Sequence, residues 1–266
     1  MLPQAKARWR KPEKIKYLMS LFVTFEGPEG SGKSTQARLL YGWLSARGYP
    51  AILVREPGGT RIGDMIRRIV LDLQNTEMAP NTETLLFAAS RAQLVSQTIR
   101  PYLGLGGIVL CDRYADSTYA YQGYGLGRDL DELRAITAAA TGGLLPDVTV
   151  YLDITAEEGL ERKRRKRQND QATGRLGQAE NALLVPPRPV APATSRENMV
   201  EWNRLDAREL AYHQKVAAGY QDLIAQEPQR WHIFDARQPV EELAEQIAHE
   251  LAPWLDHIQT LEPTTP

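Results

Sequence analysis

Apolar and polar residues alternate along the chain in two patterns. Short runs rich in β-branched and aromatic residues predict buried strands at 21–25, 51–54, 107–111, 147–153 and 231–234. Between them, apolar residues recur at helical spacing, which predicts helices at about 33–47, 61–72, 82–99, 129–141, 201–226 and 239–255. Pro101 is predicted to stop the third of these helices. Because strands and helices alternate from end to end, the pattern predicts an α/β fold with a doubly wound parallel sheet flanked by helices.

A phosphate-binding sequence separates the first predicted strand from the first predicted helix. Residues 27–34 match the pattern G-x-x-x-x-G-K-[ST] in full. Its glycines let backbone N–H groups turn toward an anion, and the next helix directs its positive end to the same place. Lys33 is expected to reach the terminal phosphates, and Ser34 to hold Mg²⁺. A chance match in a glycine turn is disfavoured by the flanking strand and helix. The predicted nucleotide-binding residues are Gly27, Pro28, Glu29, Gly30, Ser31, Gly32, Lys33, Ser34 and Thr35.

Polar residues also follow the second and third predicted strands, at the edge where parallel sheets bind ligands. Arg55 lies at the end of the second strand, although an ordinary Pro-Gly-Gly turn with a surface ion pair explains it equally well on its own. Asp112 and Arg113 end the third strand. A carboxylate there is typical of a site for Mg²⁺ or its waters, and the neighbouring arginine is suited to clamp a second phosphate.

The helix predicted at 82–99 carries Phe87 and Arg91, which are four residues apart and share one face. A ring and a guanidinium so placed are able to grip a planar ligand, although such a ring more often packs in a core. Residues 117–123 add hydroxyl, ring and amide groups in quick succession. Their density predicts one wall of a site.

Composition narrows the choice of partners and compartment. The 266 residues carry a formal net charge of −1, with a pI near 6.5, so nucleic acid is not expected as a partner. The one cysteine, Cys111, lies in an apolar run, which argues against a disulfide framework or a Cys/His metal cluster. No apolar run is long enough to span a bilayer. A cytoplasmic protein that does not bind membranes is expected.

One domain is predicted at 20–256, between two irregular ends. Residues 1–19 are basic and lack the apolar core of a secretory signal. A disordered tail or a mis-assigned start codon is favoured there over a basic arm or a targeting segment, and 257–266 is predicted to fray.

The densest basic run of the chain is 161–167. Three interpretations remain open for it: a nucleic-acid patch, a solvated helix face, or a lid that brings cations onto phosphates. The next segment, 168–200, is polar and proline-rich, which predicts an inserted loop within a lid at about 160–206.

A phosphate-binding loop indicates nucleotide binding but not a reaction. A GTPase is disfavoured because no guanine-reading Asn-Lys-x-Asp element is present, and a motor or transport ATPase because no partner domain or membrane segment is evident. A small-molecule kinase needs a second phosphate or hydroxyl site facing the loop. Arg55, Phe87, Arg91 and Arg113 are suited to build one, so the kinase interpretation is favoured.

The order of these motifs resembles the thymidylate kinase family from about residue 20 to 256. The resemblance rests on 25–34, 55–60, 86–91, 112–114 with Ser117 and 120–122, and 203–206. It implies a P-loop NTPase fold with a helical lid, and transfer of the γ-phosphoryl group of ATP to dTMP with Mg²⁺, giving dTDP for dTTP synthesis. It also implies a homodimer, for which the helix faces at 61–70 or 82–99 are candidates. The alternatives are a kinase for another nucleoside monophosphate, such as dUMP, or a non-catalytic nucleotide sensor, which would be expected to lose Lys33, Asp112 or the lid cations.

The resemblance also implies roles for individual residues. Phe87 would stack on thymine and Arg91 would bind its far edge, while Tyr121 would crowd the position of a ribose 2′-hydroxyl. The Glu56-Pro57 bond is cis in relatives. The implied substrate-binding residues are Glu29, Arg55, Phe87, Arg91, Arg113, Ser117, Thr118, Tyr121 and Gln122, and the implied metal-binding residues are Ser34 and Asp112.

The source of the catalytic cations is the point at which the sequence departs from its relatives. Some thymidylate kinases carry an arginine inside the P-loop, where this chain has Gly30. The lid is therefore the expected source, with Arg204 the main candidate and Arg162, Arg164, Arg165 or Arg167 assisting. Relatives join the basic helix to the Arg204 segment through a few residues, whereas here 168–200 intervenes. The predicted catalytic residues are Lys33, Asp112, Arg113 and Arg204.

Overall fold

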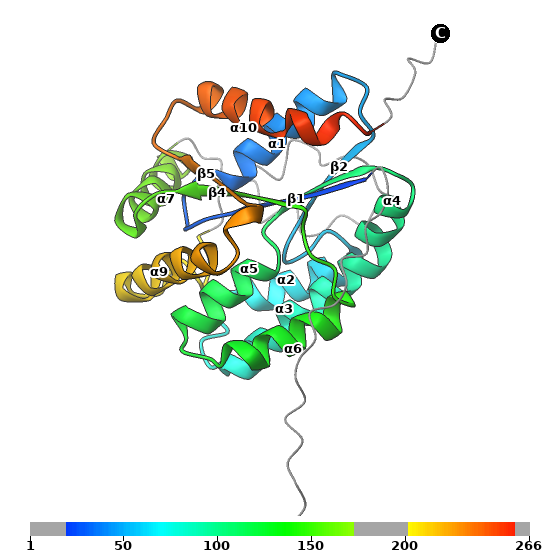
Figure 1. Ribbon diagram of the computed structural model, residues 1–266. Helices are drawn as coiled ribbons and strands as arrows, with labels where there is room; N and C mark the ends of the chain where they lie inside the picture. Colours follow the sequence, from blue (N-terminus) through cyan, green and yellow to red (C-terminus); the bar gives the residue numbers. More distant parts are fainter. Residues whose placement is uncertain (1–19, 173–201, 259–266) are drawn as a thin grey trace, which may run out of the picture.

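Five parallel strands form the single sheet of the structure, a computed structural model that describes residues 20–172 and 202–258. The strand order is β2-β3-β1-β4-β5, with β1 in the centre (Figure 1). The strands are β1 (Leu21–Glu26), β2 (Ala51–Arg55), β3 (Ile108–Asp112), β4 (Val148–Asp153) and β5 (Trp231–Asp235). The predicted parallel α/β sheet is confirmed, with strand ends within a residue or so of those expected.

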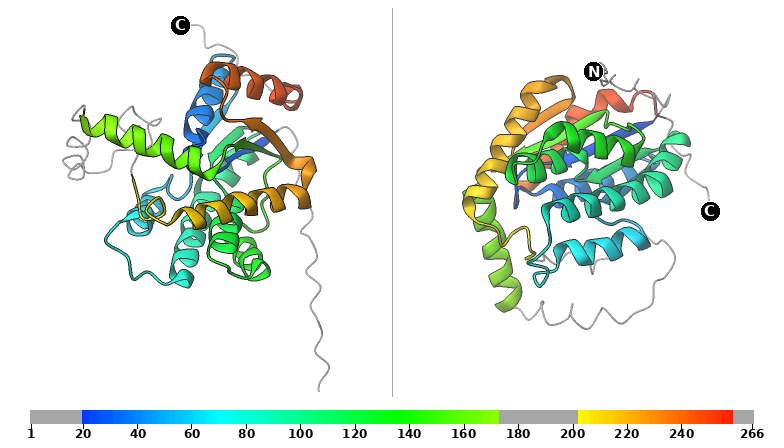
Figure 2. Two further views of the ribbon diagram at one scale, coloured as in Figure 1. Left: turned by 90° about the vertical axis from the view of Figure 1, so that its left-hand side faces the viewer. Right: turned by 90° about the horizontal axis from the view of Figure 1, so that it is seen from below.

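Helices cover both faces of this sheet. Helices α1 and α10 lie on one face, and α3, α5, α6 and α9 lie on the other, while α7 reaches outward beside the strand ends (Figures 1 and 2). The helices are α1 (Lys33–Ser45), α2 (Arg61–Leu71), α3 (Pro80–Leu94), η1 (Val95–Ile99), α4 (Arg100–Gly104), α5 (Ala115–Thr118), η2 (Tyr119–Gly125), α6 (Leu130–Thr141), α7 (Ala156–Ala172), α9 (Leu210–Gln226), η5 (Pro228–Arg230) and α10 (Val240–Leu255). Both η1 and η2 are π-helical, and η5 is a 3₁₀ turn.

Every residue of β1 is buried because the sheet is covered on both sides. Alternate residues of β1 therefore serve two cores. Val23 and Phe25 pack with α1 and α10, whereas Phe22 packs with α3 and η1. A third cluster joins η2, β4 and α9 around Tyr151 and Tyr220. Together these clusters fix the carboxyl ends of the strands, where the site is built.

The helices differ from prediction in several places, and the helical stretches at 115–125 and 156–172 were not predicted. Pro101 does not stop its helix: the N–H of Arg100 bonds the carbonyl of Val95 five residues back, and this wider π turn leads into α4. The helix predicted from 201 begins at Leu210, because the side chains of Asn203 and Asp206 bond nearby backbone N–H groups and hold a turn. Residues 168–172 are helical rather than loop.

The remaining predictions about the ends and the insertion fall largely on 1–19, 173–201 and 259–266, outside the described residues. In the parts that are described, no helix combines the length and the apolar character needed to cross a membrane.

One buried ion pair links α5 to the residue before β5. Arg230, which precedes β5, donates to both carboxylate oxygens of Asp116 on α5 at 2.6 and 2.7 Å, and to Thr149 on β4 at 2.8 Å. The Asp116 side chain is 2% exposed. Removing one partner of such a pair leaves an uncompensated buried charge.

We therefore expect Asp116→Ala to lower the free energy of unfolding by about 3 kcal/mol, measured by urea denaturation. Asp131→Ala is the matched control, because Asp131 pairs with Arg134 at the surface and is 91% exposed. Equal stability of the two variants would contradict this account of the pair.

Candidate active site

The P-loop joins β1 to α1 and presents an open helix end. Gly32 precedes α1 with φ of 97°, and no side chain caps the first turn, so its N–H groups face outward for an anion. Gly27 has φ of 144°, and a Cβ there would lie 2.6 Å from the carbonyl oxygen of Leu152. The glycine pattern thus reflects both backbone conformation and close packing.

Lys33 folds back onto the loop that it belongs to. Its ammonium donates to the carbonyls of Gly27 and Pro28 at 3.0 and 2.6 Å and to the Ser31 hydroxyl at 3.1 Å. Burial, together with the nearby charge of Arg113, lowers the pKa of Lys33 to about 7. The lysine is therefore placed to gain a proton when phosphate oxygens replace these acceptors.

Ser34 and Asp112 form the predicted metal pair. The Ser34 hydroxyl donates to the Asp112 carboxylate, across the register that sets Phe25 on β1 beside Asp112 on β3. Hydroxyl and carboxylate oxygens suit Mg²⁺, which takes its other ligands from phosphates and water. Residues 20–172 and 202–258 contain no group of three or more His, Cys, Asp or Glu placed to hold a metal. One hydroxyl and one carboxylate oxygen fit Mg²⁺ in a site that phosphates and water complete.

Arg113, Glu29 and Tyr121 meet beside the P-loop. Arg113 donates to the Glu29 carboxylate at 2.6 Å, and the Tyr121 hydroxyl donates to the same oxygen at 2.8 Å. The Arg113 guanidinium also lies 4.9 Å from the centre of the Tyr121 ring. The structure thus brings together three predicted site residues from the P-loop, the end of β3 and η2.

Arg113 holds an unusual backbone conformation, with φ of 71°. A side chain in this left-handed region costs on the order of 1 kcal/mol, so neighbouring bonds must hold it. The N–H of Arg113 donates to Phe25 at 3.0 Å, and the N–H of Tyr114 donates to Glu26 at 2.7 Å.

Glu26 is a buried carboxylate that sequence reasoning did not select. Its second oxygen accepts from the Ser117 and Tyr220 hydroxyls, each at 2.7 Å. Burial, aided by the nearby charge of Asp116, raises the pKa of Glu26 despite these bonds. Its place directly before the P-loop glycine was the available signal. Glu26 orients Ser117, which in turn accepts a bond from Arg113 at 3.3 Å.

Arg91 on α3 is 2% exposed and points toward α5. Its guanidinium donates to Glu56 at 2.7 Å and to Thr118 at 3.0 Å. Burial opposes this charge, but Glu56 outweighs burial and raises the pKa of Arg91. Atom Nη1 is buried and has no hydrogen-bond partner among the described residues. Phe87, one turn earlier on α3, is half-buried. The Glu56-Pro57 bond is cis, as expected.

Glu83 links Gln122 to two arginines. One Glu83 oxygen accepts from Gln122 at 2.9 Å, and the other accepts from Arg204 and Arg208 at 2.5 and 2.6 Å. Arg204 also donates to the carbonyl of Val70 at 3.0 Å. Arg204 is thus bound against α2 and α3 rather than to the P-loop, and its catalytic role stays a prediction. Glu83 lies four residues before Phe87 on α3, a spacing that would have indicated it.

Arg55 ends β2 directly beside Asp112 in the sheet register. Its guanidinium lies 3.9 Å from Asp64 on α2, and its side chain is 34% exposed. The structure therefore places Arg55 on the same sheet edge as Asp112.

Comparison with known proteins agrees with this geometry. Residues 25–178 match the family model described as thymidylate kinase. Curated thymidylate kinases of Roseiflexus castenholzii and Herpetosiphon aurantiacus are 69% and 59% identical, over 92% and 91% of this chain and 98% and 100% of theirs. The chain belongs to the thymidylate kinase family. The crystal structure of thymidylate kinase from Ehrlichia chaffeensis, 25% identical, matches with a TM-score of 0.62 over 87% of this chain and 98% of that one.

As a family member, the protein is a nucleoside monophosphate kinase with ATP as a substrate. The basic run at 161–167 forms part of α7, and most of its arginines face solvent. Arg162 donates to the carbonyl of Ala236 at 2.9 Å, and Arg165 pairs with Glu161 within the helix. Lys163, which was not selected from the sequence, instead reaches Glu29 of the P-loop at 3.1 Å.

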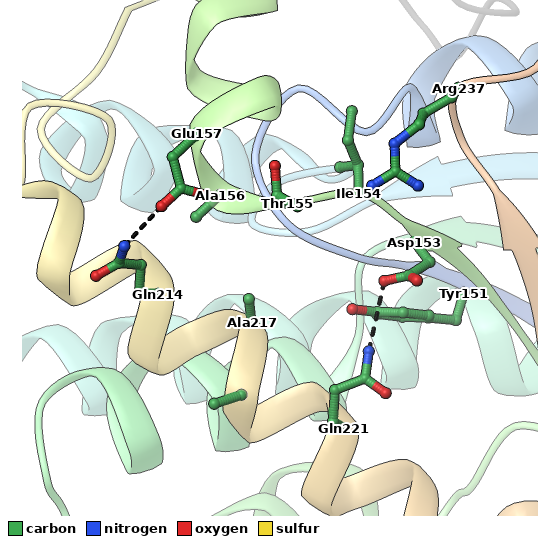
Figure 3. Close-up of a pocket in the computed structure, with 11 residues that line it drawn as sticks. Tyr151, Asp153, Ile154, Thr155, Ala156, Glu157, Gln214, Ala217, Gln221 and Arg237 are labelled. Atoms are coloured by element: carbon green, nitrogen blue, oxygen red, sulfur yellow. Dashed lines mark hydrogen bonds between the residues drawn. The ribbon is translucent and has the colours of Figure 1, made fainter.

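A pocket of about 280 Å³ lies apart from the predicted residues of the candidate site. Figure 3 shows its lining from β4, the start of α7, α9 and the loop after β5, with Glu157 bonded to Gln214 at 2.6 Å and Asp153 bonded to Gln221 at 3.4 Å. None of the residues predicted for the kinase site lines it.

ATP binding is expected to take up a proton at Lys33. At about pH 8 the free protein holds this amine mostly neutral, because its pKa is about 7, whereas the phosphates favour the ammonium. The bound state then holds more protons, so ATP affinity falls as pH rises through this range. Calorimetry in two buffers of different ionisation enthalpy should give different heats at about pH 8 and nearly equal heats below about pH 6.

Lys33→Met is the control, and it should lose most of the difference between buffers. Equal heats for the unmodified protein at the higher pH would show that Lys33 is already charged before ATP binds.

Proposed function

We propose that the protein transfers the γ-phosphoryl group of ATP to dTMP with Mg²⁺, giving dTDP and ADP. The observation that carries the proposal is the position of Arg113. Its guanidinium is held beside the P-loop by Glu29, so an acceptor phosphate bound to Arg113 would face the donor phosphates. The names of the relatives support dTMP as the acceptor.

The reaction needs positioning and charge neutralisation rather than a strong base, because the acceptor oxygen is already anionic. Lys33 and the open end of α1 would bind the donor phosphates, and Arg113 with Arg55 would bind the acceptor phosphate. Ser34 and Asp112 would hold Mg²⁺, which supplies further positive charge at the phosphate oxygens. Tyr121 packs against Arg113 and limits its movement.

Base selection would depend on the α3 side of the site. The unpartnered Nη1 of Arg91 is a donor suited to a carbonyl oxygen of thymine, with Phe87 as the stacking ring. Gln122, fixed by Glu83, would line the same pocket with Ser117 and Thr118. Nothing in these contacts reads the thymine methyl group directly, so dUMP is the competing substrate to test.

Arg113→Ala should lower kcat/KM for dTMP by about a hundredfold or more, because the acceptor phosphate loses a buried, preorganised cation. The measurement is coupled ADP release with Mg·ATP, comparing dTMP, dUMP, dCMP and AMP. Arg47→Ala is the matched control, since Arg47 is exposed at the far end of α1 and stacks on Trp43.

A preference for dUMP would change the assigned substrate but leave the assignment as a nucleoside monophosphate kinase in place. ATP binding without turnover on any monophosphate would favour a nucleotide sensor. Unchanged activity in Arg113→Ala would remove the proposed acceptor site.

We also propose that the protein is a homodimer that packs through α2 and α3. The apolar side of α2 is not covered in the single chain: Ile62, Met65 and Ile69 are 43%, 46% and 47% exposed. Leu85 on the neighbouring α3 is 56% exposed. An uncovered apolar face of this kind is typical of a protein interface.

Met65→Glu should therefore convert the dimer to a monomer, because it buries a charge in an apolar contact. Sedimentation velocity gives the mass. Ile233→Glu is the control, since Ile233 is similarly exposed but lies on the edge strand β5. A monomeric unmodified protein, or a dimer that survives Met65→Glu, would contradict the proposal.

A further inference from the structure

Two glycines bring α7 into direct contact with the P-loop. A Cβ on Gly30 would lie 2.0 Å from the carbonyl oxygen of Gly159 on α7. A Cβ on Gly159 would lie 1.9 Å from the carbonyl oxygen of Glu29. Neither position has room for a side chain without movement of the backbone. The first turns of α7 are therefore seated on the P-loop backbone itself.

Lys163 lies one helical turn after Gly159, on the same face of α7. Its ammonium donates to the second oxygen of Glu29 at 3.1 Å and to Asp206 at 2.5 Å, and its side chain is 13% exposed. The rest of the basic run is placed differently, as with Arg165, which is 74% exposed. Lys163 is thus the residue of 161–167 for which a bond to the P-loop is found.

Glu29 is held from two sides as a result. One oxygen accepts from Arg113 and Tyr121, and the other accepts from Lys163. Burial alone would raise the pKa of Glu29, but the charges of Arg113, Lys163 and Lys33 overcome burial and hold it well below its usual range. Because both oxygens are engaged, the carboxylate has one orientation, and this orientation sets the position of Arg113.

Asp206 gives Lys163 a second anchor. The Asp206 side chain is fully buried, and its other oxygen accepts from the N–H of Asn203 at 3.0 Å. Without Lys163 this carboxylate would lack its cation, since its other hydrogen-bond donor among the described residues is a backbone N–H. Lys163 therefore joins the P-loop, α7 and the turn before α9 at one point.

We propose that Lys163 is a positioning residue for phosphoryl transfer, which anchors α7 on the P-loop and orients Glu29 so that Arg113 is held in place for the acceptor phosphate. The inference rests on the proposed function, because Arg113 is assigned there to the acceptor phosphate. Loss of Lys163 would free one Glu29 oxygen and let the carboxylate rotate. Arg113, bound to the other oxygen, would rotate with it.

Lys163→Met keeps the length of the side chain and removes its charge. We expect kcat to fall about tenfold or more, in line with loss of a charged hydrogen bond. The KM for each substrate should change by less than about threefold, because positioning acts mainly in the transition state. Hydrogen exchange of the α7 amides should become faster, a change that does not depend on turnover.

Two further variants make the test specific. Lys163→Arg should restore much of the loss, because it keeps the charge and the reach to Glu29. Lys215→Met on α9 is the control, because it makes the same change at an exposed lysine away from the P-loop. It should match the unmodified protein in kcat and in the hydrogen exchange of the α7 amides. In a double-mutant cycle, Glu29→Gln combined with Lys163→Met should cost less than the sum of the two single losses.

Suppose that Lys163→Met has the kcat of the unmodified protein and the same hydrogen exchange of the α7 amides, while Arg113→Ala is inactive. This result would overturn the inference and leave the proposed function intact. Additive losses in the cycle would overturn it too, because Lys163 would then act independently of Glu29. Activity retained in Arg113→Ala would count against the proposed function instead. If Lys163→Met does not fold, Lys163→Gln with the same cycle replaces it, since the amide keeps a donor without the charge.

Discussion

The site depends on holding like charges together before any phosphate arrives. Lys33 and Arg113 lie close to each other at the P-loop, and burial makes the repulsion between them costly when Lys33 is protonated. The effect is visible at Lys33, whose pKa is lowered by burial first and by Arg113 second. Glu29 offsets this repulsion because its carboxylate binds Arg113 on one oxygen and Lys163 on the other.

The parallel sheet supplies the geometry that this charge arrangement requires. Phe25, Asp112 and Arg55 are register partners across three adjacent strands, so the P-loop and the residues proposed to bind the metal and the acceptor phosphate start from one edge. The left-handed turn at Arg113 then directs its side chain toward Glu29 instead of along the strand. Glu26 fixes this turn from below through the N–H of Tyr114. The strain at Arg113 is thus confined to a point where buried bonds hold it.

Much of this site follows from local sequence. The P-loop, the buried strands and the Phe87 and Arg91 pair are set by spacing over a few residues, and the structure places each on its expected element. Spacing alone does not give the contacts that a residue makes within its helix or with distant elements. Pro101 lies within a continuous helical segment because a π turn precedes it, and Arg204 is bound by Glu83 on a distant helix. Lys163 was missed because a run of like charges does not show which member faces inward. The glycine four residues earlier was the missing signal, and its meaning depends on a contact with the P-loop.

The close contact of Gly30 and Gly159 also explains why the P-loop itself supplies no arginine. At Gly30 the backbone has φ of 71°, and a side chain would meet the backbone of α7. An arginine at this position would have to displace the helix that now carries Lys163. A side chain at Gly30 and the seating of α7 on the P-loop are therefore incompatible in the backbone arrangement of this structure. In this chain the glycine pair brings Lys163 to Glu29, so the positive charge that α7 contributes acts on the carboxylate of the P-loop.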